Sequence, residues 1–91
     1  MKFSLGAILT VTTDIRLIQD WGEIYELFFF LEGRNVWTHE LPSLADKYTP
    51  ILLRQHPELN NIFIGAMSEE EVIPTMMKLE RIYGKELEIT R

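Results

Sequence analysis

The strongest constraint on the fold comes from residues 21–32, which predict a helix that is apolar on nearly every side. Asp20 is a suitable N-cap for this helix, and Gly33 is a suitable stop. Such a helix is either wholly buried or packed against a second molecule, and a chain of 91 residues supports one core that is too small to cover every side. We therefore predict a homo-oligomer or partner interface on this helix, formed by Tyr25, Phe29 and Phe30. The alternative is that these are core residues with one exposed aromatic.

The composition excludes several classes of protein. Nine Lys and Arg against fourteen Asp and Glu give a net charge of -5, which argues against a nucleic-acid binder held by phosphate contacts. Without cysteine there is no disulfide framework, thiolate metal site or thiol nucleophile. The longest apolar run, Leu27 to Leu31, is much shorter than the roughly 20 residues of a membrane span, and we expect no secretory signal. The prediction is one acidic, cytoplasmic domain over residues 1–91.

Three segments predict β-strands. Residues 6–13 are rich in β-branched side chains, and residues 61–66 contain Ile62-Phe63-Ile64. Residues 85–90 alternate charged and apolar side chains, as a half-exposed strand does.

Proline and capping residues predict the remaining helices. Two short helices are expected between residues 36 and 59, one starting near Pro42 and one at Thr49-Pro50. Ser68 and Glu71 form a capping-box pattern for a last helix. The order β-α-α-α-β-α-β predicts a small α+β domain, with a three-stranded sheet and helices mainly on one face. The second and third strands are expected to be parallel.

Unusual side chains gather just before the helix that is predicted to start near Pro42. A helix N-terminus carries free N–H groups and a partial positive charge, so it can hold an anion. We predict a binding site in which Trp37 stacks on a flat ligand, Thr38 and His39 hydrogen-bond to it, and Arg54 supplies charge. The structural alternative is that these side chains cap a turn, satisfy a backbone carbonyl and fill the core.

Catalytic and metal chemistry have little support in the sequence. His39 and His56 are the only side chains that titrate near neutral pH, and no histidine spacing suits the three or four ligands of a zinc site. The five glycines are scattered, so there is no phosphate loop. We expect no catalytic residue, no metal and no cofactor, with a small hydrolase that uses the two histidines as the outside alternative.

Residues 37–42 have the sequence Trp-Thr-His-Glu-Leu-Pro, and residues 52–57 have the sequence Leu-Leu-Arg-Gln-His-Pro. Together with residues 6–13, 24–27 and 83–87, they resemble a family of small phage and prophage proteins of unknown function. The resemblance implies an accessory gene product that acts in an infected bacterium, and it implies no catalytic residues.

The chain departs from the pattern of that family at two positions. The family pattern has glutamine in place of Glu40 and arginine in place of Ser43. Both differences make this segment of the chain more negative.

These observations predict a non-enzymatic protein that binds and inhibits a host protein, such as a component of an antiviral defence system. An acidic surface can occupy a site meant for nucleic acid because it mimics the charge of nucleic acid. The alternative is an oligomer that sequesters a nucleotide-like small molecule in pockets lined by Trp37, Thr38, His39 and Arg54. A basic patch would favour the alternative, and this chain is poor in basic residues.

Overall fold

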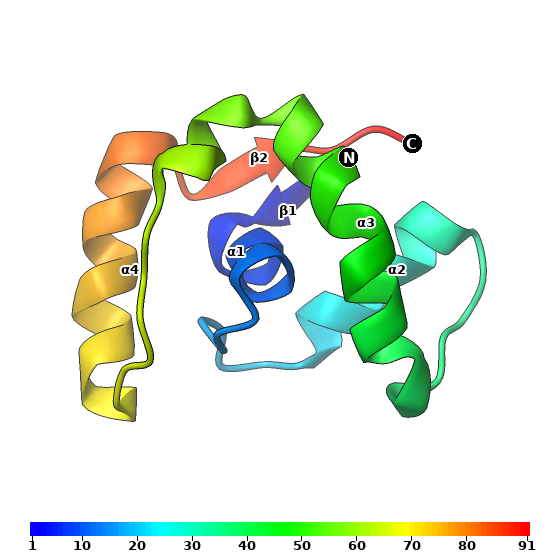
Figure 1. Cartoon of the computed structure of the whole chain (residues 1–91), viewed down its shortest axis with the longest axis horizontal. Helices are drawn as coiled ribbons and strands as arrows, with labels where there is room; N and C mark the ends of the chain where they lie inside the picture. The colour runs from blue at the N-terminus through cyan, green and yellow to red at the C-terminus, as the bar shows by residue number, and fades with distance from the viewer.

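The computed structural model describes all 91 residues and is mainly helical. Figure 1 shows α1 at the centre, with α2 and α3 on one side of it and α4 on the other. The two short strands lie together above α1 in this view, between α4 and α3. The elements in chain order are β1 (Lys2–Ser4), α1 (Leu5–Thr13), α2 (Gly22–Glu32), η1 (Thr38–Glu40), α3 (Leu41–Gln55), η2 (Pro57–Asn61), α4 (Glu69–Tyr83) and β2 (Glu86–Glu88), where η marks a 3-10 helix.

The predicted three-stranded sheet is wrong, because the sheet has only two strands. β1 and β2 pair antiparallel, with Phe3 opposite Leu87. The predicted strand over residues 85–90 is therefore present in part, but its partner is the start of the chain. No parallel pair or crossover forms, since residues 61–66 do not join the sheet.

Residues 6–13 form the helix α1 and not the predicted strand. The Ser4 hydroxyl caps this helix by accepting from the Ala7 N–H at 3.1 Å. The threonines fit a helix because their hydroxyls donate to carbonyls one turn back: Thr10 to Gly6 at 2.7 Å and Thr13 to Leu9 at 2.6 Å. Every residue from Leu5 to Val11 is buried, so tertiary packing overrides the strand propensity of the β-branched side chains.

The predicted helix over residues 21–32 is confirmed as α2, within one residue at its start. Gly33 ends it in the left-handed conformation, with φ of 75°, and donates its N–H to the Phe29 carbonyl at 2.9 Å. One side of α2 is buried against the core, and its residues are Ile24, Leu27, Phe28 and Leu31.

The two short helices predicted between residues 36 and 59 are instead one long helix, α3, followed by the 3-10 helix η2. Pro42 lies in the first turn of α3, as predicted. Pro50 lies inside α3 but is exposed. Its ring therefore faces solvent, and the helix continues past it to Gln55.

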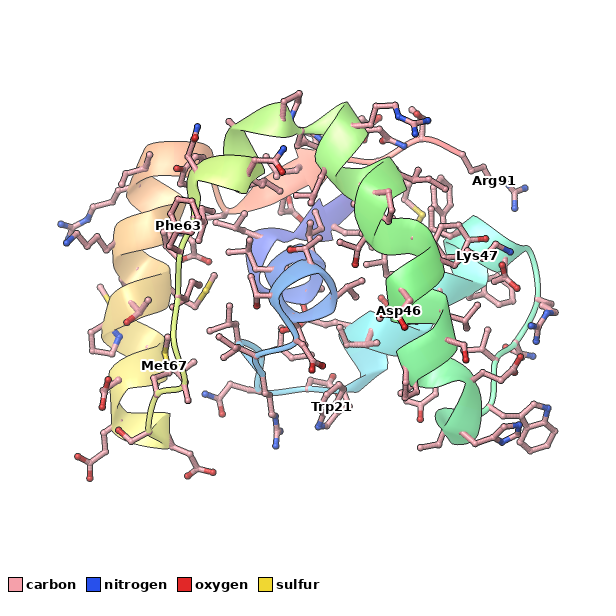
Figure 2. The ribbon with its side chains drawn as sticks, in the orientation of Figure 1. Trp21, Asp46, Lys47, Phe63, Met67 and Arg91 are labelled. Atoms are coloured by element: carbon pink, nitrogen blue, oxygen red, sulfur yellow. The ribbon has the colours of Figure 1, made fainter.

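Residues 62–67 run beside α4 without pairing to any strand (Figure 1). α4 begins directly after Ser68, where the sequence predicts its start. The predicted capping box does not form, because the Ser68 hydroxyl accepts no backbone N–H of the helix and instead donates to the Glu71 carboxylate at 3.1 Å. In Figure 2, Phe63 and Met67 lie beside α4, whereas Asp46 and Lys47 lie on α3 across the central α1.

The core is built around α1 and is closed by residues from both ends of the chain. The largest fully buried side chains are Leu5, Ile8, Leu9, Leu27, Phe28, Leu52 and Ile89. Thr10 is also buried, and its hydroxyl accepts from the Leu17 N–H at 3.0 Å. None of the helices has the length and apolar content needed to cross a lipid bilayer.

Candidate functional site

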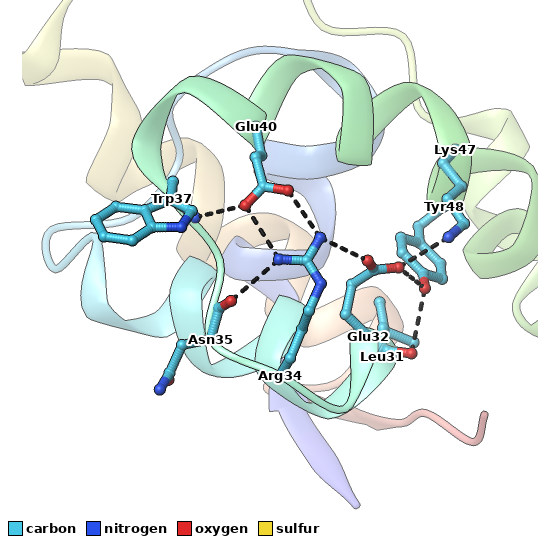
Figure 3. Close-up of polar contacts among 8 residues, drawn as sticks. All are labelled: Leu31, Glu32, Arg34, Asn35, Trp37, Glu40, Lys47 and Tyr48. Atoms are coloured by element: carbon cyan, nitrogen blue, oxygen red, sulfur yellow. Dashed lines mark hydrogen bonds and ion pairs between the residues drawn. The ribbon is translucent and has the colours of Figure 1, made fainter.

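The connection between α2 and α3 is held by the guanidinium of Arg34 (Figure 3). This group donates to both carboxylate oxygens of Glu40, at 3.1 and 2.7 Å, and to the Glu32 carboxylate at 3.1 Å. It also donates to the backbone carbonyl of Asn35 at 3.1 Å. A two-pronged contact of this kind fixes the orientation of both partners.

Glu40 closes the turn that carries Trp37. One oxygen of its carboxylate accepts from the backbone N–H of Trp37 at 2.8 Å, and its own N–H donates to the Trp37 carbonyl at 2.9 Å. This reciprocal pair is the backbone arrangement of a capping box, with glutamate at the third position after the cap. The backbone on both sides of Trp37 is therefore fixed.

Glu32 joins this network to α3. Its second carboxylate oxygen accepts from the Lys47 ammonium at 2.8 Å and from the Tyr48 hydroxyl. The Glu32 side chain is only 11% exposed, and Tyr48 is buried. The end of α2, the loop and the first half of α3 thus form one connected unit.

These contacts shift the pKa values of the acidic side chains. Hydrogen bonds from Arg34 and from the Trp37 backbone lower the pKa of Glu40 to about 2. Hydrogen bonds from Lys47 and Tyr48 lower the pKa of Glu32. The Glu40 carboxylate therefore remains charged well into the acidic range, and the contacts of Glu32 also favour its charged form.

We expect the stability of the protein to fall as the pH drops below 4.5, the ordinary pKa of Glu40. A lowered folded-state pKa stabilises the protein above the unfolded pKa, and this stabilisation is lost as the pH falls toward about 2. Glu40→Gln removes this contribution, so its melting temperature should decline less over the same range. Glu26→Gln, at an exposed carboxylate without an ion pair, should follow the wild type. Melting temperatures are measured by circular dichroism. If the melting temperature of Glu40→Gln fell as much as that of the wild type over this pH range, the attribution of the pH dependence to Glu40 would be wrong.

Trp37 is the most prominent side chain on this unit. Its side chain is 71% exposed, although its backbone is fixed. The next residue, Thr38, places its hydroxyl 2.6 Å from the hydroxyl of Tyr25, which ties the turn to the exposed side of α2. His39 is also exposed.

The four residues of the predicted binding site do not converge. Trp37, Thr38 and His39 lie together at the start of α3. Arg54 lies in the last turn of α3, thirteen residues after Leu41 and so about 20 Å further along the helix. Its side chain is exposed, but it does not line a pocket with the other three.

The predicted interface on α2 is exposed in part. The Phe29 side chain is 52% exposed, and Tyr25 is half-buried. Phe30 packs against Phe3, with 5.4 Å between ring centroids, and lies under the Arg91 guanidinium at 5.6 Å. A shallow hollow of about 680 Å³ lies on this side of α2, and its lining residues are Met1, Tyr25, Glu26, Phe29, Phe30, Gly33, Asn35 and Arg91.

The two histidines lie at opposite ends of α3. His56 follows its last residue, and its Nε2 lies 2.6 Å from the Glu88 carbonyl, so it links α3 to β2. Its Nδ1 lies 3.2 Å from the Glu58 carboxylate. His39 lies in the turn before α3. Nowhere do three His, Asp or Glu side chains lie close enough together to hold a metal ion.

Sequence reasoning missed Arg34, Glu40 and Glu32. The spacing of Trp37 and Glu40 matches the capping-box interval, but tryptophan is not a capping side chain, so the signal was incomplete. No sequence pattern indicates the role of Arg34, because its partners lie before and after a loop that has no periodic pattern.

A family model described as Domain of unknown function (DUF7736) matches residues 3–62. This range contains α1, α2, α3, both 3-10 helices and all of β1 except Lys2. No curated protein and no solved structure matches the chain. The matched range includes the whole loop around Trp37, whereas α4 and β2 lie outside it.

Proposed function

We propose that this chain, which belongs to the family described as Domain of unknown function (DUF7736), is a non-enzymatic protein that docks on a host protein and inhibits it. The supporting observation is Trp37, a largely exposed tryptophan on a loop whose backbone is already fixed by Arg34 and Glu40. Tryptophan is enriched among the few residues that dominate binding energy. A fixed loop also loses little conformational entropy when it binds.

The resemblance to phage and prophage proteins supports an origin in a phage, and hence a target in the bacterial host. The net charge of -5 supports a target with a basic surface, such as the nucleic-acid site of an antiviral defence component. Glu26 on α2 and Asp46 on α3 are exposed and form no ion pair, so they are available to such a surface.

Trp37→Ala is expected to weaken binding to the target by about 30-fold or more, because residues of this kind contribute about 2 kcal/mol or more. The target is first captured from a bacterial lysate on immobilised wild-type protein, and is then purified. Dissociation constants are measured with the purified target by calorimetry. The melting temperature of Trp37→Ala should stay close to that of the wild type, since exposed substitutions change stability by less than about 0.5 kcal/mol.

Trp21→Ala provides a control with the same chemical change. Trp21 is 41% exposed and stacks with the Arg16 guanidinium at 5.3 Å, at the start of α2. The Trp21→Ala variant should bind the target with the same affinity as the wild type. If Trp37→Ala bound as tightly as the wild type, or if both variants lost affinity equally, the docking surface would lie elsewhere.

We also propose that the protein associates with itself through Tyr25 and Phe29 on α2. Phe29→Asp should give a monomer, because it would bury a charge in the contact. Met77→Asp is the control, since Met77 on α4 has the same exposed fraction of 52% as Phe29. Sedimentation at several micromolar concentrations measures the result. A wild-type protein that stayed strictly monomeric would contradict the proposal.

A further inference from the structure

The segment of residues 62–67 has the features of a β-strand without a partner. Met67 packs against the core and Ala66 is exposed, so a strict alternation covers residues 62–65 only. Within that stretch, Ile62 and Ile64 pack against the core, while Phe63 is 92% exposed and Gly65 is exposed. This alternation is typical of a half-buried strand. No backbone N–H or carbonyl of residues 63–67 forms a hydrogen bond within the protein.

Such a segment is a template for strand pairing. Isoleucine and phenylalanine favour the extended conformation, and a row of unpaired N–H and carbonyl groups can pair with another extended chain. Binding by strand addition uses backbone hydrogen bonds for affinity and side-chain pockets for specificity. The segment has both the propensity and the free backbone groups that this mode requires.

Two hollows follow one another along the segment. The first, of about 460 Å³, lies between residues 62–65 and the threonines at the end of α1, Thr12 and Thr13. The second, of about 560 Å³, lies between residues 66–72 and residues 14–19. Residues 12–19 therefore form a facing wall along the length of the segment, and the space between the two walls suits an extended peptide.

The second hollow has an acidic rim and an apolar lining. Its carboxylates come from Asp14, Glu69 and Glu70. Its apolar lining consists of Ile15, Ile18, Ala66, Met67 and Val72. The one basic side chain, Arg16, donates to the Ile18 and Gln19 carbonyls at 3.2 and 3.1 Å. This combination suits a lysine or arginine, whose aliphatic stem packs on apolar surface while its charged end meets the carboxylates.

We propose that residues 62–67 bind an extended peptide of a partner protein by strand addition, with a lysine or arginine of the peptide in the acidic hollow. The peptide runs antiparallel to the segment, which places its basic residue at its N-terminal end. This surface is separate from Trp37, because α4 and α2 lie on opposite sides of α1 (Figure 1). The proposal therefore holds or fails independently of the proposed function.

A defined peptide tests the charge requirement. The probe is the acetylated and amidated hexapeptide Lys-Thr-Val-Thr-Val-Thr, and its control carries glutamate in place of the lysine. We expect the lysine peptide to bind with a dissociation constant below about 1 mM, and at least about tenfold more tightly than the glutamate peptide. Amide shifts of residues 63–67 in NMR titrations report where it binds. No binding at about 1 mM, or equal binding of the two peptides, would overturn the proposal.

Proline substitutions test the backbone requirement. Gly65→Pro and Ala66→Pro each remove one N–H, and the N–H groups of neighbouring residues in a strand point to opposite edges. One of the two should abolish binding of the lysine peptide. Gly65→Ala keeps the N–H and is the matched control, since no atom lies within 4 Å of the added Cβ. If both proline variants bound like the wild type, strand addition would be excluded.

A second copy of the chain is the competing occupant. Sedimentation of the wild type and of the two proline variants distinguishes it from a peptide. A dimer that either proline abolished would assign the segment to self-association, and would overturn the peptide proposal.

Discussion

Gly6→Ala is expected to lower the melting temperature by roughly 10 °C. A Cβ at this position would lie 2.7 Å from the Leu17 carbonyl oxygen and 3.1 Å from the Ile18 Cγ2. Because the first of these is a backbone atom, α1 or the turn after it has to move, which costs about 3 kcal/mol. The better helix propensity of alanine offsets about 1 kcal/mol. In a domain of this size, the remaining loss of about 2 kcal/mol corresponds to roughly 8 to 16 °C.

Gly65→Ala is the control for this experiment as well. It adds the same methyl group at a glycine that has open space around it, so its melting temperature should stay within a few degrees of the wild type. Thermal melts followed by circular dichroism measure both. A Gly6→Ala protein as stable as Gly65→Ala would show that α1 does not pack closely against residues 17–18.

Ile89→Ala should have a still larger effect on stability. Its side chain is fully buried, and its N–H donates to the Met1 carbonyl at 2.9 Å. Truncating a buried isoleucine costs about 2–5 kcal/mol, which lowers the melting temperature by roughly 8 to 40 °C at this chain length. The matched control is Ile82→Ala on α4, where the side chain is 64% exposed.

The comparison of these two isoleucines also tests the extent of the domain. Both lie beyond residue 62, where the family match ends. If the two variants were equally stable, the C-terminal residues would contribute nothing to the stability of the core. A large difference would show that the core needs residue 89 as much as it needs the matched region.

Secondary structure was predicted correctly from the sequence where it depends on local signals. α2 follows from a run of apolar side chains and from a glycine at its end. α1 does not, because its β-branched residues favour a strand locally and are helical only through complete burial. The strand expected around Ile62-Phe63-Ile64 is the opposite case. These residues favour a strand locally, but they form a half-buried segment that has no strand beside it.

The same contrast applies to the candidate site. Trp37, Thr38 and His39 were expected together because they are neighbours in the chain. Arg54 lies far from them because α3 continues through Pro50, so its last turn extends away from the loop. The network around Arg34 depends on side chains from α2, the loop and α3. No local sequence pattern predicts that these side chains come into contact.

The pairing of β1 with β2 has a consequence for how the protein is made. Lys2 pairs with Glu88, so β1 has no partner until residues 86–88 have been synthesised. The helices can form on the ribosome because their hydrogen bonds are local. The position of Ile89 in the core remains open to water until that residue has left the exit tunnel. The pairing of β1 with β2 therefore forms later than the helices, once residues 86–89 are free to reach β1.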